Sequence, residues 1–406
     1  MRTPFFIILL LVLVPSISHA QDSIEVQRGK LYGIPVPVLA SNPAFGLLFG
    51  AAGSFSIFLG EPTDTRLSTS SVAATYSSKD QLMFSIKSTA YTARDEWILQ
   101  GDIRAFFSSQ PTYGLGTGPQ SAKLAGEGIE YEDGHFSKPI VDGQLMEFNL
   151  IRFHQTAMKR FAPHFYAGIG YHLDLYFGIK DQLLDTVNIP PVLTSHFLYS
   201  IVNGFDPERY SASGISFNTS YDSRDNVNNP YEGFMAFLSL QVRPTWMGST
   251  RSYTNLWVEY RSYFNLRKRN PRNLVALWIY GNFTTSGTPP YMTLPALGWD
   301  LLGKSGRAYP QGRFRGEHLI YGEVEWRIPI PIIKRNRSLL GATIFLNGTT
   351  ASGSVSGIDL FEYINPGMGA GLRVLLNKKT RSNITLDYGF GSYGAGAFYF
   401  NLNEYF

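Results

Sequence analysis

Several segments of the chain alternate between apolar and polar side chains, each over about ten residues or more, the length that a tilted strand needs to cross a bilayer. These segments include Gln81–Thr92, Asn255–Leu266, His318–Ile328 and Ser382–Gly391. Successive side chains of a strand point to opposite faces, so each segment predicts one apolar and one polar face. Bulky charged and aromatic residues share the polar face, as in a crowded barrel lumen. The pattern therefore favours an all-β fold, a transmembrane antiparallel β-barrel, over a soluble sandwich.

Composition agrees with this interpretation. Aromatic residues make up 15% of the chain and glycine numbers 40, which suits the aromatic girdles and crowded interior of a membrane barrel. No apolar run beyond the N-terminus is long enough for a membrane helix. The net charge of +4 comes without a basic stripe, so we expect no nucleic acid partner. The chain has no cysteine, which excludes disulfides, thiolate metal sites and a lipoprotein anchor.

The N-terminus has the features of a targeting segment. One positive charge precedes a short apolar run, and the small residues Ser18 and Ala20 fit a signal peptidase site. We therefore expect a signal peptide over 1–20; the alternative, an N-terminal membrane anchor, is disfavoured because the run is short. The mature chain would comprise a short periplasmic segment over 21–44 and a β-barrel over 45–406, located in the outer membrane.

Turns of unequal length separate the expected strands. Short turns are expected at Ser77–Asp80, Lys159–Pro163, Asn226–Glu232 and Arg267–Arg272, and long connections at Ile179–Arg209 and Thr285–Arg315. Short periplasmic turns and longer external loops are typical of outer-membrane barrels. We count fifteen or sixteen strands, including one within Ser121–Phe136, and barrel closure favours sixteen.

The C-terminal segment predicts a last, strongly amphipathic strand. One face is expected to carry Phe398, Phe400, Leu402 and Phe406, interrupted only by Glu404. A final strand that ends in phenylalanine resembles the signal by which outer-membrane barrels are delivered to the insertion machinery. We therefore expect that machinery and outer-membrane lipid as partners.

Four motifs in order resemble the BamA/TamA-type family of outer-membrane assembly factors, also called bacterial surface-antigen barrels. They are Tyr221–Asp225 with Asn229–Gly233, Leu297–Gly298 with Gly306–Pro310 and Gly312–Gly316, Glu325–Pro329, and Phe345–Gly348. Upstream, Pro35–Phe49 resembles the family's entry into its first strand. The resemblance covers nearly the whole mature chain and is best from Ser216 onward. It implies a sixteen-stranded barrel with a long loop, near 287–315, folded into the lumen.

The resemblance also implies a clamp between that loop and the barrel wall, in which Arg307 pairs with Glu325 and with residue 347. Alternation independently places these wall residues on the polar face. A bidentate arginine–carboxylate pair is stronger in a partly dry lumen than at a surface, whereas the simpler alternative is an exposed loop arginine. The expected clamp comprises Arg307, Tyr309, Glu323, Glu325 and Asn347.

The chain departs from the family pattern in three places. Ala308 stands where the family has glycine, and Asn347 stands where it has aspartate, so the clamp could rest on Glu325 alone. Typical members also carry periplasmic POTRA domains, which receive client proteins, and residues 21–44 are too few to fold one. The carry-over of insertase activity is therefore an open question, and an auxiliary periplasmic subunit or client protein is a possible partner.

No motif for catalysis or cofactor binding is found. The chain has no Gly-x-Ser-x-Gly, and the glycines at 367, 369 and 371 indicate close packing in the lumen rather than a nucleotide loop. His154 and His172 lie on neighbouring expected strands and could meet a serine, as in an outer-membrane phospholipase, but polar filling of the lumen is the simpler interpretation. We expect no enzyme activity, no metal and no cofactor.

Three functions remain open. The first is protein or lipid insertion or export in outer-membrane biogenesis, through a seam between the first strand, Phe45–Leu59, and the last, Ala395–Phe406. Glycines at 46, 50, 53 and 60 would weaken that seam. The second is a passive or gated pore plugged by the long loop. The third is a structural barrel subunit of a larger envelope complex.

Overall fold

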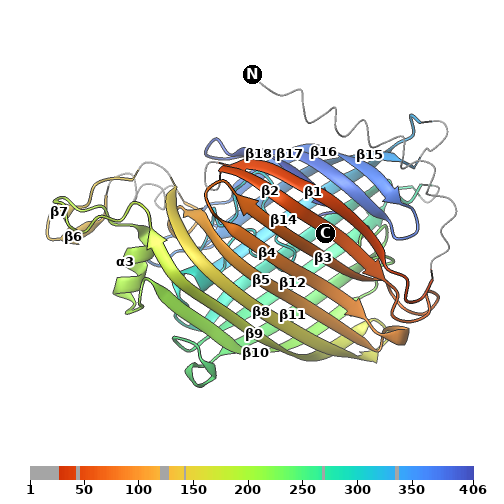
Figure 1. Ribbon diagram of the computed structural model, residues 1–406, viewed down its shortest axis with the longest axis horizontal. Helices are drawn as coiled ribbons and strands as arrows, with labels where there is room; N and C mark the ends of the chain where they lie inside the picture. Colours follow the sequence, from red (N-terminus) through yellow and green to blue (C-terminus); the bar gives the residue numbers. More distant parts are fainter. Residues whose placement is uncertain (1–26, 43–45, 119–127, 141–142, 268–269, 334–337) are drawn as a thin grey trace.

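A computed structural model describes residues 27–42, 46–118, 128–140, 143–267, 270–333 and 338–406. Sixteen strands form one continuous antiparallel sheet that curves into a barrel wall of tilted strands (Figure 1). This confirms the predicted sixteen-stranded barrel. The wall strands are β1 Tyr32–Asn42, β2 Gly46–Ile57, β3 Ser68–Ser77, β4 Leu82–Tyr91, β5 Trp97–Thr112, β8 Gln144–Ala162, β9 Phe165–Asp181, β10 Arg209–Asp222, β11 Gly233–Arg243, β12 Tyr253–Asn265, β13 Leu274–Gly287, β14 His318–Ile330, β15 Leu340–Ala351, β16 Asn365–Asn377, β17 Ser382–Gly391 and β18 Gly396–Leu402.

The barrel begins earlier than predicted. β1 runs from Tyr32 to Asn42 and pairs with β2 along its whole length, so the boundary at residue 45 and the assignment of 32–42 to a periplasmic segment are wrong. Prolines at 35 and 37 argue against a central strand, but an edge strand tolerates them. The predicted signal peptide, 1–20, lies outside the described residues.

The barrel strand expected within Ser121–Phe136 is also wrong. Residues 119–127 lie outside the described part of the chain, and the rest forms a small separate sheet from β6 (Glu130–Glu132) and β7 (His135–Phe136). This sheet belongs to the long connection between β5 and β8. The sixteenth strand is instead β1, which precedes the predicted start of the barrel.

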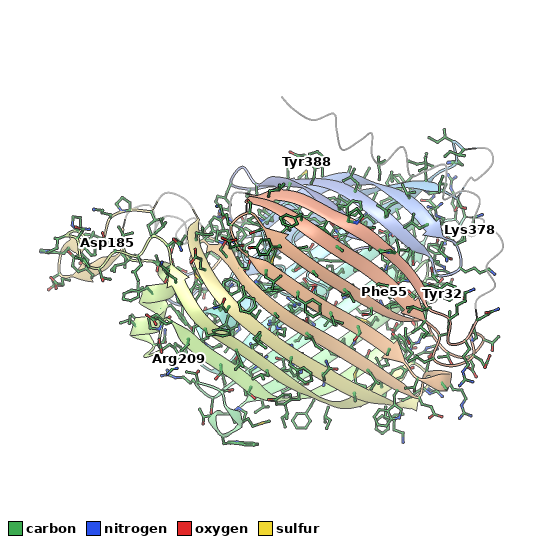
Figure 2. All side chains as sticks on the ribbon, in the orientation of Figure 1. Tyr32, Phe55, Asp185, Arg209, Lys378 and Tyr388 are labelled. Atoms are coloured by element: carbon green, nitrogen blue, oxygen red, sulfur yellow. The ribbon has the colours of Figure 1, made fainter. Side chains whose placement is uncertain are left out.

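Connections at the two ends of the barrel differ in length. The long-loop end carries β6, β7 and the helix α3 (Ser195–Val202), and the turns at the other end include the one at Lys378 (Figures 1 and 2). In an antiparallel wall, the β3–β4 turn lies at the same end as the β5–β8 connection. The short turn Ser77–Asp80 therefore lies at the long-loop end, unlike the other predicted short turns. No helix in the described part of the chain has the length and hydropathy of a membrane span.

The strand faces follow the predicted alternation. On β12, Val258, Tyr260 and Phe264 point outward and are exposed, whereas Glu259 and Arg261 are buried in the lumen. Outward apolar side chains on every second position suit a wall in contact with lipid. The lumen side is polar, and this is the environment in which the long loop is held.

The connection between β13 and β14, residues 288–317, folds into the lumen as predicted. Its aromatic residues Tyr291, Tyr309 and Phe314 are almost completely buried. The carbonyl of Tyr291 accepts a hydrogen bond from Arg315 at 2.9 Å, and the Tyr291 hydroxyl bonds Thr112 of β5 at 2.6 Å. The loop therefore crosses the lumen from β13 and β14 and contacts β5.

Candidate functional site: the loop clamp and the open seam

The tip of the inward loop presents one arginine to the barrel wall. Gly306 has φ +84° and Ala308 has φ +112°, so the backbone turns sharply on both sides of Arg307. A positive φ is ordinary for glycine and strained for alanine, which explains why the family pattern has glycine at position 308. The side chain of Arg307 is fully buried. The loop therefore delivers a buried positive charge that the wall must neutralise.

Three carboxylates surround the Arg307 guanidinium. Glu323 and Glu325 of β14 accept charge-assisted hydrogen bonds from Nη2, and Asp387 of β17 accepts one from Nη1 at 3.2 Å. The guanidinium also lies over the rings of Phe345 at 3.8 Å and Tyr405 at 4.0 Å. The structure thus brings Arg307, Glu323 and Glu325 together as predicted.

Asn347 donates hydrogen bonds in the clamp, whereas an aspartate at this position would accept them. Its amide donates to the backbone carbonyl of Arg307 at 2.9 Å and to Glu323 at 3.3 Å. The carboxylate missing at position 347 has a counterpart in Asp387, which the prediction did not include in the clamp. Alternation within Ser382–Gly391 places Asp387 on the polar face of its strand, so the sequence carries this signal, but no motif points to the residue.

Tyr309 and two glycines of β17 allow the loop tip to pack closely against the wall. The Tyr309 hydroxyl donates to the Pro366 carbonyl and accepts from the Ser392 backbone N–H at 2.9 Å. A Cβ at Gly389 would lie 3.0 Å from the Ala308 nitrogen, and one at Gly391 would lie 2.5 Å from the Tyr309 ring. The absence of these side chains lets the loop approach the wall backbone.

The glycines of β16 have the predicted role of close packing. A Cβ at Gly367 would lie 2.5 Å from the Asn347 side chain, and one at Gly371 would lie 1.6 Å from the Asp387 side chain. Neither position has room for a larger residue. The alternate glycines therefore clear space for the clamp and form no nucleotide loop.

The clamp continues into the last four residues of the sequence. Asn403 has φ +63°, and after it the chain leaves the wall and enters the lumen, where Glu404, Tyr405 and Phe406 are buried. We call residues 403–406 the tail. The expectation that Phe406 shares the outward face is therefore wrong, whereas Phe398 and Phe400 do point outward and are exposed. Leu402, on the same face, is partly buried.

Tail and clamp share their charged partners. Glu404 accepts a hydrogen bond from Arg373 at 2.9 Å, and Arg373 also pairs with Asp387 at 2.5 Å. Arg327 bonds the Phe406 backbone oxygen at 2.9 Å and Glu325 at 2.6 Å. Glu404 was recognisable in the sequence as the one charge that interrupts an apolar face, and its burial beside arginines explains that interruption.

Two lysines hold the remainder of the loop. Lys304 donates to the backbone oxygens of Leu402 at 3.3 Å and Glu404 at 2.7 Å, and Lys87 of β4 donates to the Leu302 carbonyl at 2.7 Å. Burial lowers the pKa of Lys304 to about 8, against the opposing effects of Glu404 and Asp300. Neither lysine was singled out from the sequence.

The wall is unpaired at one place. Across the described strands, no backbone pairing joins β1 to β18, although both line the same lumen cavity. Pro35 and Pro37 occupy alternate positions of β1, opposite Gly53 and Ala51 of β2. Proline has no N–H, so an edge strand accommodates it where the N–H would point away from its partner. β1 therefore has two fewer N–H donors than a strand of the same length without proline.

The glycines thought to weaken the seam lie elsewhere. Gly50 and Gly53 belong to β2, which pairs on one side with β1 and on the other with β3. A Cβ at Gly50 would lie 2.2 Å from the Ala74 carbonyl, so this glycine allows close contact between paired strands. Neither glycine therefore lies on the free edge of β1.

The histidine pair is built into polar packing. His172 contacts the Ser216 hydroxyl at 2.8 Å, and the Asn218 amide donates to the same oxygen at 2.8 Å. His154 pairs with Asp174 at 3.1 Å. Ser216 is completely buried, unlike an accessible nucleophile. Within the described residues, no group of three or more His, Asp or Glu side chains is arranged to hold a metal ion.

Comparison with known proteins agrees with this geometry. The sequence matches the Omp85 superfamily domain over residues 58–406. The fold is similar to BamA from Haemophilus ducreyi lacking POTRA domains 1-3, with TM-score 0.55 and 14% identity over 94% of this chain and 70% of that one. It is also similar to CdiB from Acinetobacter baumannii, with TM-score 0.51 and 11% identity over 92% of this chain and 59% of that one. No curated protein sequence matches significantly.

Proposed function

The chain belongs to the Omp85 superfamily of outer-membrane barrels, and from this premise we propose that it moves a substrate into or across the outer membrane through the β1–β18 seam. The family supports insertion or translocation in general; the seam is our assignment. The observation that carries it is the unpaired seam beside an otherwise continuous sheet.

The seam is weak for a physical reason. A closed barrel has no free strand edge, because every backbone group in the bilayer needs a partner. Pro35 and Pro37 remove two donors from the edge of β1, so closure there gains fewer hydrogen bonds than between two strands without proline. The seam is therefore the place where we expect the wall to open and a substrate to pass between lumen and lipid.

The inward loop next to the clamp also contacts the last strand, β18. The Tyr399 hydroxyl of β18 accepts from the Ala308 N–H at 3.0 Å and donates to the Tyr309 carbonyl at 3.3 Å. The loop thus anchors the last strand from inside the lumen. We infer that the lumen network keeps β18 in place while its outer edge stays unpaired.

A cysteine lock tests the proposal, and the chain offers a cysteine-free background. Single cysteines in β1 at Pro35, Val36 or Pro37 are combined with single cysteines in β18 at Phe400 or Asn401. Only pairs with suitable Cβ separation will oxidise. A locked seam is expected to abolish function in cells and reducing agent to restore it; full activity of a fully oxidised lock would refute the seam. The matched control is a cysteine pair at Tyr388 and Phe398, which are already cross-strand partners.

A second candidate, a gated pore, is favoured by the lumen cavity of about 3200 Å³. Planar-bilayer recordings separate the two. A pore conducts steadily in the native chain, whereas a seam translocase with a docked loop conducts only after residues 299–313 are deleted.

Further parts of the proposal concern biogenesis and partners. We propose export by a signal peptide cleaved after residue 20, which N-terminal sequencing of the mature chain tests. We also propose that the barrel works without catalysis, alongside an auxiliary periplasmic subunit that co-purification from native membranes would detect.

A further inference from the structure

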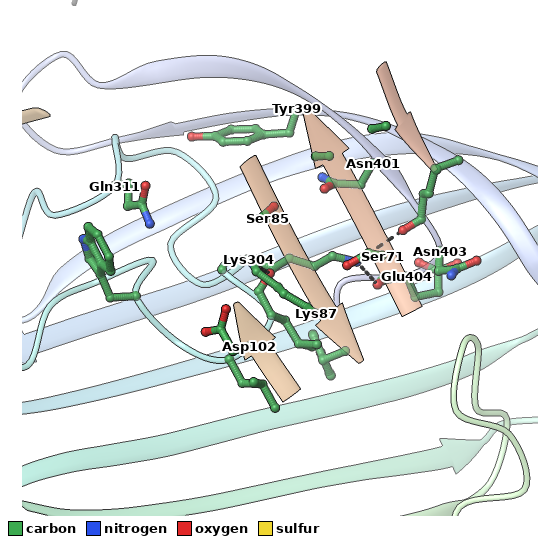
Figure 3. Close-up of a pocket in the computed structure, with 18 of the residues that line it drawn as sticks. Ser71, Ser85, Lys87, Asp102, Lys304, Gln311, Tyr399, Asn401, Asn403 and Glu404 are labelled. Carbon is green, nitrogen blue, oxygen red and sulfur yellow. Dashed lines mark hydrogen bonds between the residues drawn. The ribbon is translucent and has the colours of Figure 1, made fainter. Parts of the chain in front are cut away.

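The lumen cavity lies against the inner face of β2, β3 and β4 and extends across to the inward loop and β18 (Figure 3). The side chains that these three strands turn inward are mostly small, with hydroxyls at Ser54, Thr69, Ser71, Ser85 and Thr89. Such short side chains leave the space in front of them unfilled. The cavity is therefore polar on this wall and has room for a ligand.

Two ammonium groups enter this cavity, Lys87 from β4 and Lys304 from the loop (Figure 3). Each has three N–H donors. Within the described part of the chain, protein acceptors take one donor of Lys87 and two of Lys304, and all of these acceptors are backbone oxygens. No carboxylate of the described residues lies within ion-pair distance of either lysine.

The nearest carboxylates are already engaged. Asp102 makes two hydrogen bonds of 2.7 Å to Arg104, and Glu404 accepts from Arg373 at 2.9 Å. Asp300 accepts from the backbone N–H groups of its own turn and from the Ser305 hydroxyl at 2.7 Å. The two ammonium groups therefore lack the direct partner that partly buried charges normally have.

The lowered pKa of Lys304 agrees with an incompletely compensated charge. A phosphate oxygen in the cavity could accept the remaining N–H groups of both lysines, and the hydroxyls on β3 and β4 could bond the same group. Charge-assisted hydrogen bonds of this kind are strong in a water-poor site. The site fits an anion better than a neutral sugar or peptide.

The seam connects this site to the bilayer. Val36 and Val38 of β1 line the cavity, and the outward-facing Phe398 and Phe400 of β18 border its opening at the unpaired edge. These apolar side chains suit acyl chains that pass between the strands. The two prolines of β1, by contrast, oppose the addition of a guest β-strand, which needs N–H donors along the edge.

We propose that Lys87 and Lys304 bind the phosphate of a phosphorylated amphiphile whose head group enters the lumen through the seam while its acyl chains remain in the bilayer. This inference rests on the proposed function and names its substrate class, a phospholipid-like molecule rather than an unfolded polypeptide.

The test measures binding of dioleoyl-phosphatidylglycerol to the full chain purified in a neutral detergent, by native mass spectrometry. Replacing each lysine by glutamine keeps a donor for the backbone contact and removes the charge. The double variant K87Q/K304Q is expected to bind about tenfold more weakly for each lysine removed, the scale of a charged hydrogen bond. K87R/K304R should retain binding, and the exposed-lysine control K180Q should bind like the wild type.

Three results would overturn the inference. One is equal binding by the wild type and K87Q/K304Q, both shown to be folded by heat-modifiable gel migration. Another is equal binding of dioleoylglycerol, which has no phosphate. The third is displacement of the lipid by inorganic phosphate at equal concentration, which would assign the site to a soluble anion.

This binding measurement requires no transport, so its failure is distinguishable from failure of the proposed function. Unchanged lipid binding in K87Q/K304Q, together with loss of function in the locked seam, would reject the lipid site alone. Lysine-dependent lipid binding, together with full activity of the locked seam, would reject the seam alone.

Discussion

Replacing Arg307 by methionine removes the single cation at the centre of the clamp. The consequences differ among its three carboxylates. Glu325 keeps Arg327 at 2.6 Å and Arg373 at 3.7 Å, and Asp387 keeps Arg373 at 2.5 Å. Glu323 has no other ion pair in the described structure and keeps only uncharged partners. The variant therefore leaves one buried carboxylate, that of Glu323, without a cationic partner, rather than three.

The expected cost follows from that count. Breaking a buried ion pair by removing one partner typically costs ~3–5 kcal/mol, because the other charge stays buried. We expect R307M to lose that amount of unfolding free energy. Adding Glu323→Gln removes the unpaired charge. The unfolding free energy should then recover by ~2 kcal/mol, since the amide can still bond Tyr321 and Asn347.

Urea unfolding of the chain in detergent micelles, followed by tryptophan fluorescence, measures both variants. The control R209M changes an arginine at the long-loop end whose side chain is 80% exposed, and it should leave the midpoint unchanged. The reasoning would be refuted if R307M unfolds like the wild type, or if Glu323→Gln lowers the stability of R307M further.

Four other changes test separate parts of the structure. Ala308→Gly should raise stability by roughly 1 kcal/mol in the same unfolding assay because it relieves a positive φ, and an unchanged or lower value would contradict the strain. Gly389→Val should displace the loop tip, which limited proteolysis would detect as new cleavage near residues 305–312; continued protection would contradict the fit. Pro35→Ala with Pro37→Ala should restore N–H donors on the edge of β1, stabilise the seam and reduce function. Normal activity, together with slowed amide hydrogen exchange at the seam, would argue against opening. Deprotonation of Lys304 should weaken phosphatidylglycerol binding between pH 7 and pH 9 in the wild type and in K87R, with K87R/K304R unaffected; a flat profile in K87R would exclude the charge of Lys304 from the site.

Much of the wall could be predicted because side-chain alternation is a local property. Val258 and Glu259 fall on opposite faces of β12 by chain geometry alone, whatever the rest of the barrel does. The inward loop followed from a motif that includes Arg307, together with lumen carboxylates at the right alternation. Predicting these features requires only the local side-chain pattern and one long-range contact, that of Arg307 with the lumen carboxylates.

The errors occurred where long-range context overrides local preference. Prolines 35 and 37 argue against a strand unless the strand is known to be an edge, and that knowledge comes only from the assembled sheet. The tail continues the apolar alternation of β18 up to Phe406, but Asn403 turns it into the lumen, where Glu404 meets Arg373. Asp387 was placed on the correct face, but only the fold shows that it neighbours Arg307.

The central claim is that β18 has one paired and one free edge. Residue-resolved amide hydrogen exchange of the folded chain in micelles tests it directly, because successive N–H groups of residues 396–402 point alternately to β17 and to the seam. An open seam predicts alternating slow and fast exchange along β18, while residues 215–221 of β10, which pair with both β9 and β11, exchange slowly throughout. Uniformly slow exchange in β18, equal to that of β10, would show a closed barrel and contradict the account.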